Sequence, residues 1–466
     1  MTFRKLIGTL LMAVGVLSVP LEAKEFEQDG GRFLEELNER DFEALRDYLR
    51  VKREEDIAHG NKTPDVTFSG DIRFEYRNIH ERELGKRLRG GKHGRKCVDG
   101  KRIGVPISNN DFDIEFNLRL DYITECTWAV ARVQWDNSAG VDDSDLDCNA
   151  NPFGYRGSGI CDDVCLKMAY WGAHLYKSGT EKLDIELGRR NLYNVFDSRV
   201  QFLSRFDGVA LRYSNSRDWF GSWYWYSAAF VVDERVNQFA WVSEVGLIDI
   251  LHSGLDLKYS IIDWQKRGVN RCNARNPIGF KFLNSQVTAA YNFKPEVIRR
   301  KAKIFGAFVY NHEGQKGKYF PYKNKHQICR KSDDHFRKEG KVFIPNTVRV
   351  KTAKNQNKAW YAGALIGEVD KEGDWSFEVR YEWVQAFAIP DDDISGIGRG
   401  NCLDDQLAAA GARGNGNYKG WHFEGLYAIT DNLTIDAQFE FSQALSKKIG
   451  GSHHYSKFEL ETIYAF

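Results

Sequence analysis

Hydrophobic and polar side chains alternate along most of this chain. In one stretch the hydrophobic residues Phe112, Ile114, Phe116, Leu118 and Leu120 occupy every second position. Charged or polar residues fill the positions between them, which are Asp113, Glu115, Asn117 and Arg119. A period of two is that of β-strands, whose successive side chains point to opposite faces of the sheet. The pattern runs from residue 66 to the C-terminus and predicts an all-β region.

The length of the alternating segments separates two all-β architectures. Strands of soluble sandwiches typically have ~5–6 residues, whereas strands that cross a membrane need ~9–11. Most segments here reach the membrane length. The alternation predicts sixteen strands, over residues 66–78, 110–123, 127–136, 165–176, 182–189, 206–214, 221–232, 238–248, 254–264, 284–293, 301–311, 358–368, 375–386, 419–429, 433–444 and 455–466.

Short and long connections mostly alternate between these strands. Short turns follow the even-numbered strands, whereas 79–109, 137–164, 312–357 and 387–418 are long. Outer-membrane barrels combine short periplasmic turns with longer outside loops. Because hydrocarbon offers no hydrogen-bond partners, a sheet inside a membrane must close on itself. We therefore expect residues 66–466 to form a 16-stranded antiparallel transmembrane β-barrel, apolar outside, charged inside and wide enough for an aqueous channel.

The first 65 residues follow a different pattern. Two basic residues and an apolar stretch that ends at Pro20 predict a signal peptide over residues 1–23, which is cleaved during export. Residues 24–65 are expected to form a short periplasmic amphipathic helix, about residues 32–54, and a linker. That helix could pack on the barrel, self-associate or contact the cell wall. Its apolar positions are Leu34, Leu37, Phe42, Leu45 and Leu49.

Composition agrees with a strand-rich folded chain. Hydrophobic residues make up 42% and charged residues 28%, which excludes a disordered chain. Aromatic residues reach 14%, and 42 Gly accompany only 9 Pro, which favours strands and turns. No apolar run beyond the leader approaches the ~18 residues of a membrane-spanning helix. The formal net charge of +1 gives no case for nucleic-acid binding.

The last strand carries a family resemblance. Its apolar residues alternate with Lys457, Glu459 and Glu461, and the sequence ends on Phe466. This resembles the C-terminal strand by which the barrel assembly machinery handles bacterial outer-membrane barrels. The layout of leader, helix, sixteen strands and terminal Phe resembles a bacterial outer-membrane porin. The resemblance implies outer-membrane localisation, contact with lipid and lipopolysaccharide, and a homotrimer.

A second, local resemblance lies around the fifth connection. Several porin families join a strand ending in Gly-Arg to one starting Phe-Asp-Gly-Val, as in Gly188-Arg189-Arg190 and Phe206-Asp207-Gly208-Val209. In general porins the loop at this place folds into the lumen and narrows it. The alternative is an outward loop with solvated charges. The resemblance implies six constriction candidates: Arg189, Arg190, Asp197, Arg199, Arg205 and Asp207.

The charged face of the alternating segments supplies the pore-lining candidates. Both signs of charge occur among them, so the sequence does not determine ion selectivity. They are Arg73, Glu75, Glu115, Arg132, Lys167, Glu186, Arg212, Lys303, Arg380, Asp436 and Glu440.

Eight cysteines set this chain apart from ordinary porins. All but Cys126 fall in or beside expected outside loops, and exported proteins sit where disulfides persist. Such cysteines resemble those of the major-outer-membrane-protein-like porins of certain obligate intracellular bacteria, which build disulfide-linked envelopes. Pairing is not readable from spacing, because eight cysteines allow 105 connectivities. The disulfide candidates are Cys97, Cys148, Cys161, Cys165, Cys272, Cys329 and Cys402.

Other chemistry finds little support in the sequence. Cys161 and Cys165 lack the second close pair of a zinc site, and the acidic run near Asp143 lacks the Gly and Glu of a calcium loop. We therefore expect no metal, cofactor or catalytic residue and no enzymatic activity. The basic stretch 86–102 is either a patch for lipopolysaccharide phosphates or host polyanions, or a solvated loop.

Two functions remain at this stage. The first is a porin, whose water-filled channel lets small hydrophilic solutes and ions diffuse passively. The alternative is a non-conducting surface barrel that acts as an adhesin or as a disulfide-linked structural protein of the cell envelope. Whether the barrel is open distinguishes them.

Overall fold

The computed structural model describes residues 65–83, 86–87, 95–98, 101–106, 109–138, 163–217, 219–233, 238–265, 282–313, 356–390, 393–397, 416–446 and 454–466. The signal peptide and the helix expected over residues 32–54 lie outside this part. None of its helices is both long and apolar enough to cross a membrane.

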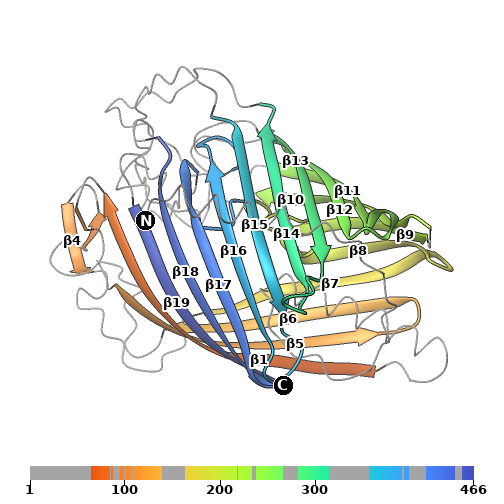
Figure 1. Cartoon of the computed structure of the whole chain (residues 1–466), viewed down its shortest axis with the longest axis horizontal. Helices are drawn as coiled ribbons and strands as arrows, with labels where there is room; N and C mark the ends of the chain where they lie inside the picture. Colours follow the sequence, from red (N-terminus) through yellow and green to blue (C-terminus); the bar gives the residue numbers. More distant parts are fainter. Residues whose placement is uncertain are drawn as a thin grey trace, which may run out of the picture.

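Sixteen long strands of the described chain form one antiparallel sheet (Figure 1). They are β1 (Asp65–Glu83), β5 (Asn110–Ile123), β6 (Thr127–Ser138), β7 (Asp163–Ser178), β8 (Glu181–Asn191), β9 (Arg205–Arg217), β10 (Gly221–Asp233), β11 (Gln238–Ile248), β12 (Leu255–Trp264), β13 (Phe282–Phe293), β14 (Ala302–Asn311), β15 (Lys358–Glu368), β16 (Trp375–Val384), β17 (Tyr418–Thr430), β18 (Leu433–Ala444) and β19 (His454–Ala465).

The sheet closes on itself. Each long strand pairs with its neighbours in the sequence, and β1 also pairs with β19, from Asp71 opposite Ala465 to Arg82 opposite His454. Figure 1 shows these first and last strands side by side. Phe466 extends the closure, since its N–H and carbonyl group exchange hydrogen bonds of 3.0 and 2.9 Å with Gly70. The prediction of a closed 16-stranded antiparallel barrel is confirmed.

The long connection between β1 and β5 contains three short strands. β2 (Lys86–Arg87) pairs with the end of β1, while β3 (Arg95–Val98) and β4 (Lys101–Pro106) form a separate hairpin. Cys97 lies on β3. The long connection over residues 79–109 thus contains short strands that the alternation did not indicate.

The outer face of the wall is apolar. Phe68, Phe377 and Phe439 are 65%, 43% and 45% exposed, and each occupies an outward position in its strand. Their inward neighbours Ser69, Glu378 and Gln438 are polar. A barrel with an apolar outside and a charged inside suits lipid around it and water within it.

Candidate functional site: the charged lumen and its two inner loops

The connection between β8 and β9 folds into the barrel. It comprises residues 192–204, called here the first inner loop, and opens with a single 3-10 turn, η2 (Leu192–Asn194). A pair of glycines, Gly188 opposite Gly208, lies just before the loop leaves the wall. Gly188 has a φ of +132°, and a Cβ there would overlap the carbonyl oxygen of Ala169. Only glycine fits this backbone comfortably.

Two ion pairs link the first inner loop to the inner wall. Lys258 Nζ on β12 lies 2.8 Å from Asp197 Oδ2, and Arg199 Nη2 lies 3.0 Å from Glu378 Oε2 on β16. The Asp197 N–H donates to Glu244 Oε2 on β11 at 3.3 Å. These partners all face inward and come from three separate strands, so the loop spans the lumen.

Apolar packing also holds the first inner loop. Leu192, Phe196 and Phe202 are at most 1% exposed and pack against inward side chains of β9 to β13. Phe230 and Trp264 belong to this cluster, with ring centroids 5.8 Å apart. The inner face of β9 to β13 is therefore partly apolar where the loop covers it. The rule of apolar outside and polar inside fails locally for this reason.

A second connection also turns inward. It comprises residues 385–397, described at 385–390 and 393–397, and is called here the second inner loop. Ile389, Ile394 and Ile397 are at most 2% exposed and form one cluster with Val200 of the first inner loop. The Ile397 N–H donates to Glu382 Oε2 on β16 at 3.3 Å. The sequence predicted an outside loop over residues 387–418. The second inner loop turns into the lumen instead.

The contacts of the two loops fall on β9 to β17. The wall on the other side, formed by β18, β19, β1 and β5, has more carboxylates than cations at its inward positions. The cations are Lys457, Arg73, Arg77 and Arg119. The carboxylates are Asp71, Glu75, Asp113, Glu115, Asp121, Asp436, Glu440, Glu459 and Glu461.

Many of these charges lie against one another on the wall. Arg77 bonds to Glu75 and lies 2.8 Å from Asp113, while Lys457 Nζ lies 2.9 Å from Glu459. Asp436 is less well compensated. Gln438 Nε2 donates to its Oδ2 at 2.6 Å, but its buried Oδ1 has no hydrogen-bond partner. Its cross-strand neighbour is another carboxylate, Glu461.

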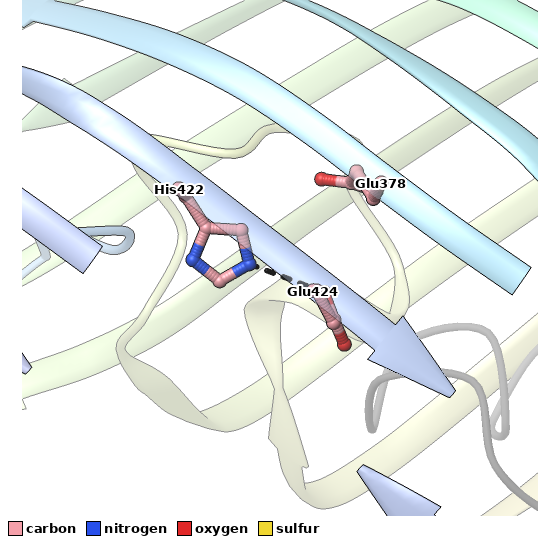
Figure 2. A group of neighbouring side chains, drawn as sticks. All are labelled: Glu378, His422 and Glu424. Atoms are coloured by element: carbon pink, nitrogen blue, oxygen red, sulfur yellow. Dashed lines mark hydrogen bonds and ion pairs between the residues drawn. The ribbon is translucent and has the colours of Figure 1, made fainter. Parts of the chain in front are cut away.

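Three side chains near the loops have the composition of a metal site. Figure 2 shows Glu378 on β16 beside His422 and Glu424 on β17, and their ligand atoms lie within 4.8 Å of one another. Both oxygens of Glu378 are already bonded to guanidinium groups, Arg380 at 2.7 Å and Arg199 at 3.0 Å. Two cations beside one ligand disfavour a divalent metal by Coulomb repulsion.

His422 completes an ion-pair network instead. Its Nε2 lies 3.2 Å from Glu424 Oε2, as the dashed line in Figure 2 marks, and its Nδ1 lies 3.1 Å from Glu440 Oε1. A protonated imidazole can donate to both carboxylates. Two runs of alternating charge then lie side by side on the wall. One goes from Arg199 through Glu378 and Arg380 to Glu382. The other goes from Glu424 through His422 and Glu440 to Lys457.

Ten of the eleven pore-lining candidates occupy inward positions. Arg73 contacts Glu115 and Glu461 across two strands, and Arg212 contacts Glu186 at 3.3 Å. Lys303 and Arg132 also face inward, and Arg132 is 4% exposed. Lys167 is the exception, because it falls at a β-bulge where the register of β7 against β6 shifts. Alternation cannot assign such a residue to a face.

The six constriction candidates separate into two groups. Asp197 and Arg199 lie on the first inner loop, and Arg190 points inward from β8, where it bonds to Glu186 and lies over the Tyr170 ring. Arg189 and Asp207 pair at 2.7 Å on the opposite face, 39% and 52% exposed. Arg205, exposed at the first position of β9, shares that face by alternation. These three side chains therefore do not reach the lumen.

The structure describes few of the cysteines. Cys126 is exposed in the turn between β5 and β6, and Cys165 lies near the other end of β7, with its Sγ 3.7 Å from Gln134 Oε1. Within the described part of the chain, neither of the two forms a disulfide. Cys148, Cys161, Cys272, Cys329 and Cys402 lie outside the described residues, so the disulfide predictions that involve them stay predictions.

This chain is similar to known proteins in structure but not in sequence. No protein-family model and no curated protein matches this sequence. Among solved structures, OprB of Pseudomonas putida matches with a TM-score of 0.45 and 11% identity, covering 91% of this chain and 97% of that one. Salmonella typhi OmpF, in complex with daunomycin, matches with 0.43 and 12%, covering 87% and 99%. A variant of the Rh. blastica porin matches with 0.40 and 8%, covering 86% and 100%.

Proposed function

We propose that this protein is an outer-membrane porin whose water-filled channel lets small hydrophilic solutes and ions diffuse passively. The observation that carries the proposal is the first inner loop, because two ion pairs and one backbone hydrogen bond join it to the inward face of three separate strands. A loop held across the lumen narrows a passage without filling it. A non-conducting barrel has no need for the many charged side chains on the inner wall outside β9 to β13.

The part of the lumen that the inner loops leave free is the expected path of the solutes. Since the inner loops contact β9 to β17, solutes pass along the wall of β18, β19, β1 and β5. The excess of carboxylates there favours cations over anions, because fixed charges raise the local concentration of ions of opposite sign. On this proposal Asp197 and Arg199 act as constriction residues because their ion pairs hold the first inner loop in the lumen. The remaining candidate, Arg190, supports the wall from the inner face of β8.

The proposal includes the surroundings of the barrel. The apolar outer face suits a bacterial outer membrane with lipopolysaccharide, reached after export through a cleaved signal peptide and insertion by the barrel assembly machinery. A homotrimer and disulfide links to other envelope proteins belong to the same proposal. Crosslinking of intact cells, analysed with and without reductant, tests both kinds of association.

Single-channel recording tests the channel itself. The full-length protein, refolded into a planar lipid bilayer, should produce stepwise conductance increments, and vesicles that contain it should admit small sugars. Gln438→Trp, which places a large ring in the passage, should lower the conductance. Ala437→Trp, at the adjacent outward position, is the matched control and should not.

The alternative function predicts a different result. A folded, inserted protein that shows neither conductance steps nor sugar uptake would refute the porin. It would instead support the non-conducting surface barrel. Equal conductance of the two tryptophan variants would show that the passage does not follow this wall.

A further inference from the structure

The two inner loops meet along a hydrogen-bonded seam, although about 190 residues separate them in the sequence. The Ser395 N–H donates to the carbonyl oxygen of Val200 at 3.0 Å, and Ser395 Oγ donates to that of Gln201 at 3.2 Å. Apolar side chains on both sides of the seam are fully buried, among them Val200 and Ile389. The seam therefore has the packing of a protein interior, and the loops behave as one unit.

Asp393 lies at the centre of this seam. Three consecutive backbone N–H groups of the first inner loop end on it. Phe202 N donates to Asp393 Oδ2 and Ser204 N to Oδ1, both at 3.2 Å, while Leu203 N donates to its carbonyl oxygen, also at 3.2 Å. Asp393 is fully buried. A carboxylate removed from water in this way needs such donors to offset its desolvation.

The bonded stretch of the first inner loop is strained. Phe202 has a φ of +74°, in the left-handed region that residues other than glycine seldom adopt. Such a conformation persists only where its surroundings determine it. The three hydrogen bonds to Asp393 and the burial of the Phe202 ring hold Phe202 in this conformation. The strained turn directs the chain back to β9 after it has presented Asp197 and Arg199 to the lumen.

We propose that the described residues 385–390 and 393–397 form a second constriction loop, and that Asp393 is the positioning residue that holds the first inner loop across the channel. This inference rests on the proposed porin function. Two contacts with β16 fix the second inner loop in turn. Ile397 N bonds to Glu382, and a Cβ on Gly396 would overlap the Glu382 carboxylate. The wall thus positions the second loop, and the second loop positions the first.

Substitution of Asp393 tests the proposal. Asp393→Ala removes both side-chain acceptors and should raise single-channel conductance roughly twofold, as the first inner loop leaves the passage. Asp393→Asn, which removes the charge but retains one acceptor, should give a smaller rise. Asp431→Ala is the matched control, because Asp431 also accepts a backbone N–H, at 2.9 Å from Glu372, but lies in the turn between β17 and β18.

Hydrogen exchange provides a readout that does not depend on conduction. Amides of residues 202–204 should exchange at least tenfold faster in Asp393→Ala than in wild type or Asp431→Ala. Thermal unfolding identical in both variants would show that the barrel is intact. Unchanged exchange at these amides, or faster exchange with unchanged or lower conductance, overturns the proposal. A wild type that does not conduct refutes the porin function, whereas the exchange result still decides the positioning role.

Discussion

The opposite environments of the two faces of one strand can be tested with a single pair of substitutions. Gln438 and Phe439 are neighbours near the middle of β18, which runs from Leu433 to Ala444. Phe439 is 45% exposed on the outer face, opposite Phe423 and Phe458, whereas Gln438 faces the lumen. Arginine at either position introduces the same charge, so the difference between the two variants measures the surroundings alone.

The expected loss at Phe439 has two parts. An arginine on the lipid face near the midplane costs roughly 2–4 kcal/mol. The Phe439 ring also lies 5.9 Å from Phe441 and 6.5 Å from Phe423 between centroids. Loss of such aromatic contacts adds roughly 0.5–1.5 kcal/mol. Phe439→Arg should therefore lower the free energy of unfolding by about 3–5 kcal/mol, which changes the folding equilibrium by about two to four powers of ten.

The expected loss at Gln438 is much smaller. Its neighbours in the strand register are Glu424 and Glu459, and its amide already bonds to Asp436. A guanidinium group there finds carboxylates in a wet lumen, where an ion pair contributes about 0–1 kcal/mol. Gln438→Arg should leave stability almost unchanged and reduce the preference of the channel for cations.

Urea unfolding in lipid vesicles, followed by tryptophan fluorescence, measures both stabilities. Ion selectivity comes from the reversal potential of a bilayer held across a salt gradient. Equal destabilisation of the two variants would refute the assignment of faces or the aqueous lumen. A large shift of selectivity in Phe439→Arg without loss of stability would do the same.

Three further predictions follow from the lumen and the turns. Arg199→Ala should raise single-channel conductance, because it removes the 3.0 Å contact between the first inner loop and Glu378. An unchanged conductance step would refute this prediction. Asp436→Asn combined with Glu461→Gln should move the reversal potential towards anions, and no movement would show that these carboxylates do not act on passing ions. Cys126 should be free or linked between molecules. The residue after Cys126, Thr127, pairs with Ala173 on β7, and Ala173 lies eight residues along that strand from Cys165. Eight residues of strand span about 26 Å, whereas the Cα atoms of a disulfide lie within ~7 Å of each other. Peptide mapping that finds Cys126 bridged within one chain would overturn the strand order.

Strand positions were predictable because the membrane imposes one simple rule on every segment. Gln238–Ile248 and Leu433–Ala444 begin and end at the residues that alternation indicated. β1 continues to Glu83, five residues beyond the expected end, because it keeps pairing with β19 above the alternating region. The hairpin of β3 and β4 was missed, although Asp99-Gly100 between them is a pair typical of two-residue hairpin turns.

The candidate site was less predictable, because side-chain faces depend on register and on long-range contacts. Arg189 and Arg190 are adjacent basic residues, yet one is exposed outside and the other is 1% exposed inside. A count of charges cannot distinguish them, whereas strict alternation from Glu186 assigns Arg190 to the inner face. Asp393 has no such signal. Its role depends on backbone groups of residues 202–204, which only the folded chain brings close.

One sequence feature does indicate where an inner loop packs. Along β10 the alternation fails, since Tyr224, Tyr226 and Phe230 face inward while Trp223 and Trp225 face outward. A strand that is apolar on both faces has no wet side, so something other than water must cover its inner face. The cover is the first inner loop, whose Phe202 belongs to the same buried cluster as Phe230. In a chain of alternating membrane strands, a segment that loses its polar face therefore marks a part of the lumen that is filled by protein.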